Sequence, residues 1–216
     1  MTDEHGYPVR LEIDYPEDGL NRVTTAFRLV LVIPIAVVAG LLTTSAIDWT
    51  AEDVSAGLEA WAALFAAGGF VFLPTLLMIL FRQKYPRWWF DWNQELMRFS
   101  VRVSAYLALL RDEYPSTDEQ QGVHLDIDYP DARRDLNRWL PLVKWLLAVP
   151  HYVALALLGL IAVMLVVITW FAILFTGRCP RGVFGFQVGV LRWFVRVYSY
   201  TVLLATDRYP PFSLDR

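Results

Sequence analysis

The sequence predicts a mainly α-helical membrane protein made of two tandem repeats. Its composition is too apolar for a water-exposed surface, because 56% of the 216 residues are hydrophobic and only 19% are charged. Apolar runs recur at the length of a membrane span. The same order of motifs also occurs twice, which divides the chain into units of 1–116 and 117–216. In each unit we expect a short cytoplasmic β-strand, a transmembrane hairpin and an interfacial amphipathic helix.

The duplication is visible in two pairs of segments. VRLEIDYPEDGLNR at 9–22 returns as VHLDIDYPDARRDLNR at 123–138. Further along, RFSVRVSAYLALLRDEY at 98–114 returns as RWFVRVYSYTVLLATDRY at 192–209. We therefore expect the two units to fold in much the same way and to pack on each other.

Four transmembrane helices are expected, as one hairpin in each unit. Val23–Leu42 and Leu58–Phe81 are each long enough to cross a hydrocarbon core of about 30 Å. The apolar stretch Trp139–Thr176 would be roughly 57 Å long as one helix, almost twice that core. The repeats align at an offset of 116 around the start of this stretch and of 94 from its end onward, so the first unit carries 22 extra residues. We therefore expect two short helices with a tight turn near Gly159, either crossing or partly re-entrant.

The charges predict how the chain lies in the membrane. None of the 19 Lys and Arg residues falls in the long loop Thr43–Gly57, which holds Asp48, Glu52 and Asp53. Basic loops stay in the cytoplasm. Both termini and the middle of the chain are therefore expected inside, and this acidic loop outside.

An amphipathic helix is expected after each hairpin. In Trp88–Leu110 the charged residues fall on one face and the aromatic and aliphatic residues on the other, as in a helix that lies in the membrane plane. Val183–Leu204 is apolar nearly all round, and Gly182, Gly185 and Gly189 would let another backbone come close. This composition predicts burial against protein. The competing interpretation is a fifth span, in which two central arginines would cost about 2.5–3.5 kcal/mol each.

Two short strands are expected on the cytoplasmic side. Val9–Asp14 and Val123–Asp128 alternate apolar and polar residues and end in Asp-Tyr-Pro, which favours a turn. Two isolated strands are marginal alone, so we expect them to pair with each other or with a partner. The candidate N-caps of the helices that follow are Asn21 and Asn137, or Asp18 and Asp135.

The second unit resembles the DUF4389 family. It has DYP, LNR, a proline thirteen residues after that asparagine, FTGRCPRGVFGFQVGVLRW and a closing DRYPPFSL. The first unit resembles a diverged copy, with RQKYPRWWFDW in place of TGRCPRGVFGF and DEYPST in place of DRYPPFSL. Together the two units cover almost the entire chain. The resemblance implies a bacterial inner-membrane protein and brings no catalytic residues.

Few residues are candidates for a functional site. His151 lies inside an apolar stretch, and an intramembrane histidine could relay protons or ligate a haem or metal; the alternative is a neutral, hydrogen-bonded side chain. The first unit has Ile35 at the matching place. A second group of basic residues could bind anionic lipid headgroups, or could form an ordinary basic rim. The members of this group are Arg98, Arg102, Arg192, Arg196, Arg28 and Lys144.

No motif for catalysis, a cofactor or a metal is present. The chain lacks a phosphate loop, zinc-ligand spacing and a nucleophile elbow. Its single cysteine, Cys179, excludes an internal disulfide and a thiolate cluster. The dispersed basic residues give no support for nucleic-acid binding. We expect a non-enzymatic accessory or scaffold subunit that docks on another membrane complex; the alternative is a self-associating lipid-binding or permeation module.

Overall fold

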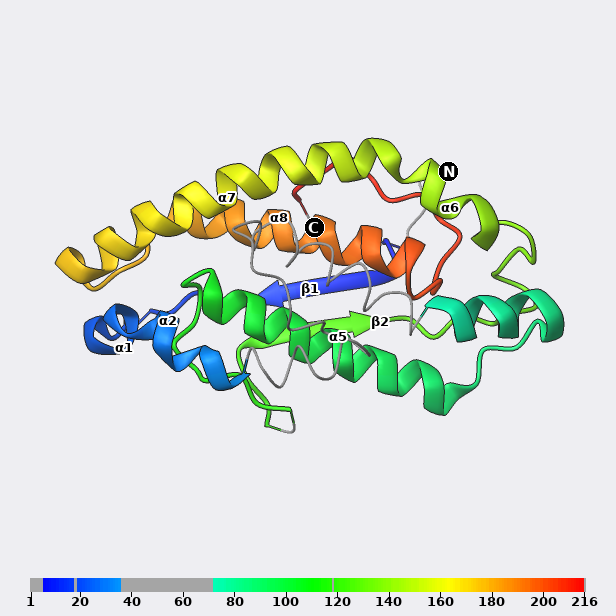
Figure 1. The fold of residues 1–216 in the computed structure, drawn as a ribbon, viewed down its shortest axis with the longest axis horizontal. Coiled ribbons are helices and arrows are strands. Elements are labelled where there is room, and N and C mark those ends of the chain that lie inside the picture. The colour runs from blue at the N-terminus through cyan, green and yellow to red at the C-terminus, as the bar shows by residue number, and fades with distance from the viewer. Residues whose placement is uncertain (1–5, 18, 36–71, 118, 216) are drawn as a thin grey trace, which may run out of the picture.

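The computed structural model describes residues 6–17, 19–35, 72–117 and 119–215 (Figure 1). The elements in chain order are β1 (Val9–Ile13), α1 (Arg22–Ala26), α2 (Arg28–Leu31), a π-helical turn η1 (Met78–Arg82), α5 (Arg87–Leu107), β2 (Val123–Ile127), α6 (Pro141–Leu147), α7 (Val149–Thr176) and α8 (Arg181–Thr201). The strand pair lies between α8 and α5, and α7 runs alongside α8 on the outer side (Figure 1).

The strands of the two repeats pair with each other, as predicted. They are antiparallel, with Val9 opposite Ile127 and Leu11 opposite Leu125. Leu11 and Leu125 are equivalent positions of the two repeats, so an approximate twofold axis passes between them. The two units therefore face each other across the centre of this sheet.

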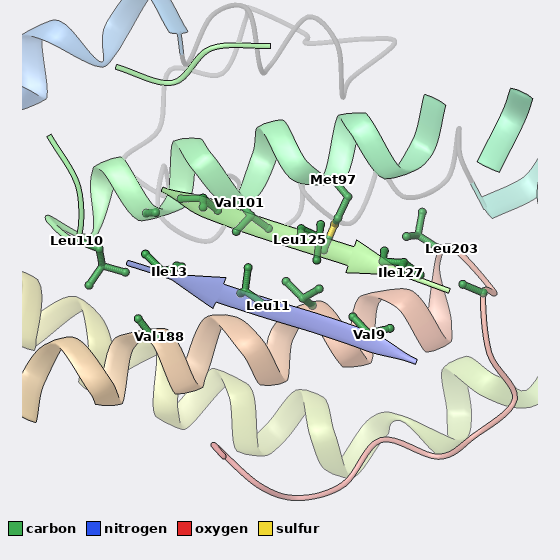
Figure 2. Packing of buried hydrophobic residues seen from close by; sticks show 14 of the residues in the cluster. Val9, Leu11, Ile13, Met97, Val101, Leu110, Leu125, Ile127, Val188 and Leu203 are labelled. Carbon is green, nitrogen blue, oxygen red and sulfur yellow. The ribbon is translucent and has the colours of Figure 1, made fainter. Parts of the chain in front are cut away.

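The sheet has one apolar and one charged face. Its buried face consists of Val9, Leu11 and Ile13 with their counterparts on β2, and it packs on α5 and α8 (Figure 2). The opposite face, which we call the charged face, is exposed and consists of Arg10, Glu12, His124 and Asp126. Strict alternation places the two sets on opposite sides of the pleat.

Equivalent arginines cover the two outer edges of the sheet. In an antiparallel pair every second residue turns its carbonyl away from the partner strand, and the register places Leu11 and Leu125 among these. Arg192 Nε on α8 donates to the Leu11 carbonyl at 3.1 Å, and Arg98 Nη2 on α5 donates to the Leu125 carbonyl at 2.9 Å. These contacts satisfy edge carbonyls that would otherwise be open to another strand.

The tyrosine of each DYP motif joins one repeat to the other. Tyr15 Oη donates to the Cys179 carbonyl at 2.6 Å, just before α8. Tyr129 Oη donates to the equivalent Tyr85 carbonyl at 2.5 Å, just before α5. The rings packed edge-on against these tyrosines, at 5.0 and 5.2 Å between centroids, are Phe184 and Phe90. The duplicated motif therefore ends a strand and also clamps the two repeats together.

Helix α7 overturns the prediction of four transmembrane helices. It is one continuous helix of 28 residues, and Gly159 is buried in its middle where a turn was predicted. The flanking residues are mostly Ala and Leu, which are strong helix formers. One glycine costs only about 1 kcal/mol relative to alanine, which is too little to end such a helix without further turn residues. The predicted hairpin within Trp139–Thr176 is therefore wrong.

The interruption in this stretch lies at a proline instead. Helix α6 ends at Ala148, and α7 begins there with Pro150 in its first turn. In the first turn of a helix the missing N–H and the ring of proline are tolerated. At its other end α7 stops at Gly177, whose φ of 74° is left-handed.

The first unit is described only in part. Helices α1 and α2 are short and separated at Phe27. The described part of a later helix, Phe72–Arg82, is shorter than a membrane span. The loop Thr43–Gly57 and the rest of 36–71 lie outside the described residues. Among the described helices, α7 is the one long and apolar enough to cross a membrane by length and composition, which favours membrane association.

The helices predicted after each hairpin are present as α5 and α8. Helix α8 packs on α7, β1 and α6, so its predicted burial against protein is confirmed. A Cβ added at Gly189 would lie 2.8 Å from the Leu214 Cβ. The absence of a side chain at this position therefore allows the C-terminal segment to pack directly on α8. Gly182 and Gly185 have open space around them in the described part of the chain, and their predicted packing role stays a prediction.

Replacing Tyr15 with Phe should open the start of α8. Cys179 is the only cysteine and is 2% exposed, and burial raises its pKa to about 11, so its thiol should react slowly in the native protein. Loss of a buried hydrogen bond of about 1 kcal/mol predicts roughly fivefold faster alkylation by a maleimide. Tyr129→Phe, which removes the equivalent bond on the other repeat, is the control and should leave the rate unchanged. Equal rates in both variants would contradict the clamp.

Replacing Gly159 with Pro should distinguish a helix from a turn. In the continuous helix, proline removes a backbone hydrogen bond and costs about 3 kcal/mol, which corresponds to a loss of roughly 6–12 °C in Tm. Gly159→Ala is the matched control and should not lower Tm. The measurement is thermal unfolding in mild detergent. An unchanged Tm for Gly159→Pro would contradict the continuous helix and support a turn at this position.

Candidate functional site: twin buried cation sites

Arg28 and Lys144 are buried cations at equivalent positions of the two repeats. Arg28 follows α1 and Lys144 lies in α6, and they are 2% and 0% exposed. Sequence reasoning assigned both to lipid headgroups. In the structure each side chain turns inward, toward the end of the long helix of its own repeat.

In the first repeat the cation is Arg28. Its Nη1 donates to the Tyr106 carbonyl at 2.9 Å, and its Nη2 pairs with the Asp112 carboxylate. The guanidinium carbon lies 4.4 Å from the centroid of the Tyr106 ring, within cation–π range. The second oxygen of Asp112 accepts the backbone N–H of Asn21.

The second repeat reproduces this arrangement with a lysine. Lys144 Nζ donates to the Thr206 carbonyl at 2.7 Å and pairs with Asp207 Oδ1 at 2.7 Å. The ammonium lies 4.9 Å from the centroid of the Tyr200 ring. The other oxygen of Asp207 accepts the backbone N–H of Asn137. The two sites therefore share a cation, a carboxylate, a tyrosine ring and an asparagine.

The local sequence explains how each carboxylate reaches its cation. After α5 and α8 the chain turns through a left-handed residue, Leu109 with φ 60° and Leu204 with φ 55°. Leucine in this region is strained by roughly 1–2 kcal/mol, so the surrounding contacts must hold it there. The turn brings Asp112 or Asp207 back to the LNR motif. The second repeat has one residue more before this turn, so the equivalent leucines and aspartates stand at an offset of 95.

The asparagine of each LNR motif accepts backbone N–H groups just ahead of it. Asn21 Oδ1 accepts the N–H groups of Val23 and Thr24 at the start of α1, so this predicted N-cap is confirmed. Asn137 Oδ1 accepts the Trp139 N–H at 2.9 Å, but α6 begins two residues later with Leu140 at its N-cap, so the predicted Asn137 cap is wrong. Side chain and backbone of the asparagine are thus both engaged.

Burial and ion pairing oppose each other at these sites. Burial lowers the pKa of the Lys144 ammonium and of the Arg28 guanidinium, and the neighbouring carboxylate raises it again. Such a pair contributes little net stability, but removing one partner leaves a charge buried and costs about 3–5 kcal/mol. The buried ion pair, together with the hydrogen bond from the asparagine N–H to its carboxylate, therefore holds the end of the long helix against the LNR turn, and we call this arrangement the lock.

The remaining headgroup candidates also bind oxygens of the protein itself. Arg98 and Arg192 hold the sheet edges. Arg102 Nη1 donates to the Ser116 carbonyl at 2.7 Å, and Arg196 Nη1 donates to the Ser213 carbonyl at 3.3 Å. Arg102 and Arg196 are 8% and 3% exposed. A lipid headgroup would have to displace these contacts, so the geometry does not favour this prediction.

His151 sits in an aromatic cage. It is 0% exposed, its Nδ1 accepts the Trp193 indole N–H at 3.1 Å, and its ring stacks on Phe212 at 3.9 Å. An accepting Nδ1 places the hydrogen of the neutral ring on Nε2. The first repeat has Ile35 and Phe99 at the places of His151 and Trp193. Both members of the hydrogen-bonded pair are therefore apolar there. This favours the neutral, hydrogen-bonded interpretation.

His151 is not part of a cluster of metal-ligand residues in the described part of the chain. No group of three or more His, Cys, Asp or Glu side chains among those residues could hold a metal ion. The rings around His151 are those of Trp193, Tyr209 and Phe212. Sequence reasoning missed Asp112 and Asp207, although both recur after the Leu-Leu of the long helices and the duplication marked them.

Comparison with known families bears on the second repeat. A family model described as a domain of unknown function (DUF4389) matches the region from the start of α6 to Ser213. Residues 139–213 are therefore similar to the DUF4389 family. The resemblance expected for the second unit is thus confirmed. Comparison with curated proteins and with solved structures gives no match.

The matched region contains one complete half of the twin arrangement. Lys144, Tyr200 and Asp207 lie inside the matched region, as do His151 and the Phe212 that covers it. The DYP and LNR motifs of this unit precede residue 139 and lie outside the match. The lock therefore joins the matched domain to the strand and turn before it.

The lock at Lys144 and Asp207 can be tested with a double-mutant cycle. Lys144→Met and Asp207→Asn should each lower the free energy of unfolding by about 3–5 kcal/mol, because each leaves one buried charge unpaired. The double variant should lose clearly less than the sum, by more than about 1 kcal/mol. Arg10→Met, which breaks an exposed ion pair on the charged face, is the control and should have a small effect. Additive single effects in detergent unfolding would exclude the lock.

Proposed function

We propose that this protein is a membrane-associated accessory subunit that docks on another membrane protein. The observation that carries this proposal is the outward face of α7. From Val149 to Phe175 every exposed side chain of this helix is apolar. Soluble monomers rarely expose a contiguous apolar patch of more than a few hundred Å². Lipid and the helices of a partner are the two coverings that suit such a face.

The charged face of the sheet supports an arrangement with α7 in the membrane plane. The axes of α7, α8 and β1 are roughly parallel (Figure 1). If α7 stood across the bilayer, the exposed Arg10 and Asp126 would lie at hydrocarbon depth beside it. Exposed charged side chains are expensive at that depth. With α7 at the interface, the sheet faces water and α7 faces the acyl chains.

We extend this proposal to the cellular location of the protein and to the origin of its two repeats. We place the protein at the inner membrane of a bacterium with the sheet on the cytoplasmic side, in keeping with the DUF4389 domain and the basic residues of the helices. We also take the first unit to be a diverged copy of that domain. The support is the common set of contacts in both units: the edge arginines, the clamping tyrosines and the buried cations.

Docking on a partner is favoured over a lipid-binding or permeation module. The six basic residues that would recognise headgroups bind the protein's own oxygens. The sheet edges are covered by arginines, which leaves them unsuited to adding a strand. The large apolar helix faces are what remains for recognition, and they suit the helices of another membrane protein.

Purification from native cells in mild detergent, with mass spectrometry of proteins and lipids, tests this function. We expect a stoichiometric membrane protein in the wild-type sample and its loss from a Leu160→Gln, Met164→Gln variant, both positions being exposed on α7. Glu12→Gln on the charged face is the matched control and should retain the partner. A protein that elutes alone, with no crosslinked neighbour in cells, would refute the accessory role.

A further inference from the structure

Three tryptophans are in contact at the start of α5. The rings of Trp89 and Trp92 stack at 5.3 Å between centroids with an interplanar angle of 19°, and the Trp88 ring meets Trp89 edge-on at 5.6 Å. Trp89 Nε1 donates to Thr75 Oγ1 at 2.9 Å, and Thr75 is fully buried. Trp88 and Trp92, in contrast, are 70% and 40% exposed. We call these three tryptophans the platform, because the central ring is fixed by the protein and the outer two are presented at the surface.

Two further aromatic side chains are exposed at the same end of the molecule. Arg138 Nε donates to the Leu80 carbonyl at 2.5 Å, which joins the segment before α6 to the end of the helix before α5. Phe81 and Trp139, the neighbours of these two residues in sequence, are 70% and 65% exposed. The starts of α5 and α6 lie toward one end of the molecule (Figure 1). Exposed aromatic side chains therefore come from three segments at this end.

Basic residues lie between these rings in the sequence. Arg82, Lys84 and Arg87 are all exposed. Within the described part of the chain Arg82 and Lys84 form no ion pair, and Arg87 has only a distant one, at 3.9 Å from Asp91. Tryptophan rings are at home at headgroup depth, and exposed lysine and arginine attract anionic lipid. These three basic residues are distinct from the six that bind the protein's own oxygens.

The repeat symmetry relates the depth of this end to that of α7. Leu11 and Leu125 are equivalent, lie opposite each other and point to the same face, so the twofold axis is perpendicular to the sheet. With α7 in the membrane plane, a step that rests on the proposed function, this axis follows the membrane normal. Equivalent residues then stand at equal depth. Phe81 is the equivalent of Phe175, which belongs to the exposed apolar face of α7.

We propose that the platform and the basic residues beside it bind the surface of a bilayer that contains anionic phospholipid. The positive charges are complementary to such a surface, and the exposed rings can enter its headgroup layer. The second repeat keeps two of the cations, as Arg178 and Arg181, but has Gly182 at the place of Trp88. The aromatic part of this contact therefore belongs to the first repeat alone, and it anchors one end of the molecule.

The purified full chain, labelled with 5-fluorotryptophan and placed in bicelles, tests the proposal. A water-soluble gadolinium chelate relaxes fluorine nuclei that are open to water, and single Trp→Phe variants assign the resonances. With phosphatidylglycerol in the bilayer we expect the Trp88 and Trp139 resonances to relax at least about threefold less than in phosphatidylcholine alone. Equal relaxation in the two bilayers would overturn the proposal.

A matched pair of double variants makes the test specific to this surface. Lys84→Gln with Arg87→Gln should remove most of the protection that phosphatidylglycerol gives, because each basic residue near the surface adds to the attraction. Arg178→Gln with Arg181→Gln neutralises the equivalent positions at the other end and should leave the protection of Trp88 unchanged. An equal loss in both variants would show a general effect of charge and would contradict a local site.

A protein partner is the other occupant that the assay distinguishes. If Trp88 and Trp139 are protected only in the complex purified from cells, the surface binds protein and the lipid proposal is wrong. The bicelle assay needs no native partner, so the two proposals fail separately. A chain that elutes alone but shows protection by phosphatidylglycerol would refute the accessory role only. A native partner without this protection would refute the lipid contact only.

Discussion

The antiparallel pairing of β1 with β2 is the constraint on which the rest of the molecule depends. Because Leu11 lies opposite its own repeat equivalent Leu125, the register places the two units about a common axis. That axis brings the DYP tyrosine of each unit to the helix start of the other and an arginine to each outer edge. A slip of one residue would turn the apolar residues of a strand toward water and move both clamps out of reach. The five-residue strands are too short to be stable alone, so the helices and the sheet stabilise each other.

The twin cation sites show which features of a duplicated site are fixed by geometry. The cation changes from arginine to lysine, and one residue is added before the carboxylate, yet the carboxylate still accepts the backbone N–H of the LNR asparagine. A left-handed leucine absorbs the difference in length in both units. Arginine and lysine place their charge at different reach and with different donor geometry. The position of the carboxylate relative to the helix start is therefore constrained more tightly than the identity of the cation.

Much of the framework could be predicted from the sequence because the chain repeats it. The strands, the two long helices, the burial of α8 and the Asn21 cap all rest on local patterns that occur twice or on residues with one strong preference. The hairpin in the second unit was wrong because a length rule for membrane spans was applied to α7, whose continuity is set by local helix propensity. Arg28 and Lys144 were assigned to the membrane surface because their partners, Asp112 and Asp207, lie far away in sequence. Only the fold brings such groups together, and no local pattern measures the distance between them.

The two units share one set of contacts and differ in another, which separates the residues that hold the fold from those that vary. Their shared contacts, which are the edge arginines, the clamps and the locks, are all turned inward and hold the fold. One difference lies in the interior: the second unit has the pair His151 and Trp193, and the first unit has Ile35 and Phe99 at the same places. Because these residues are buried in both units, the two copies achieve the same burial with different side chains.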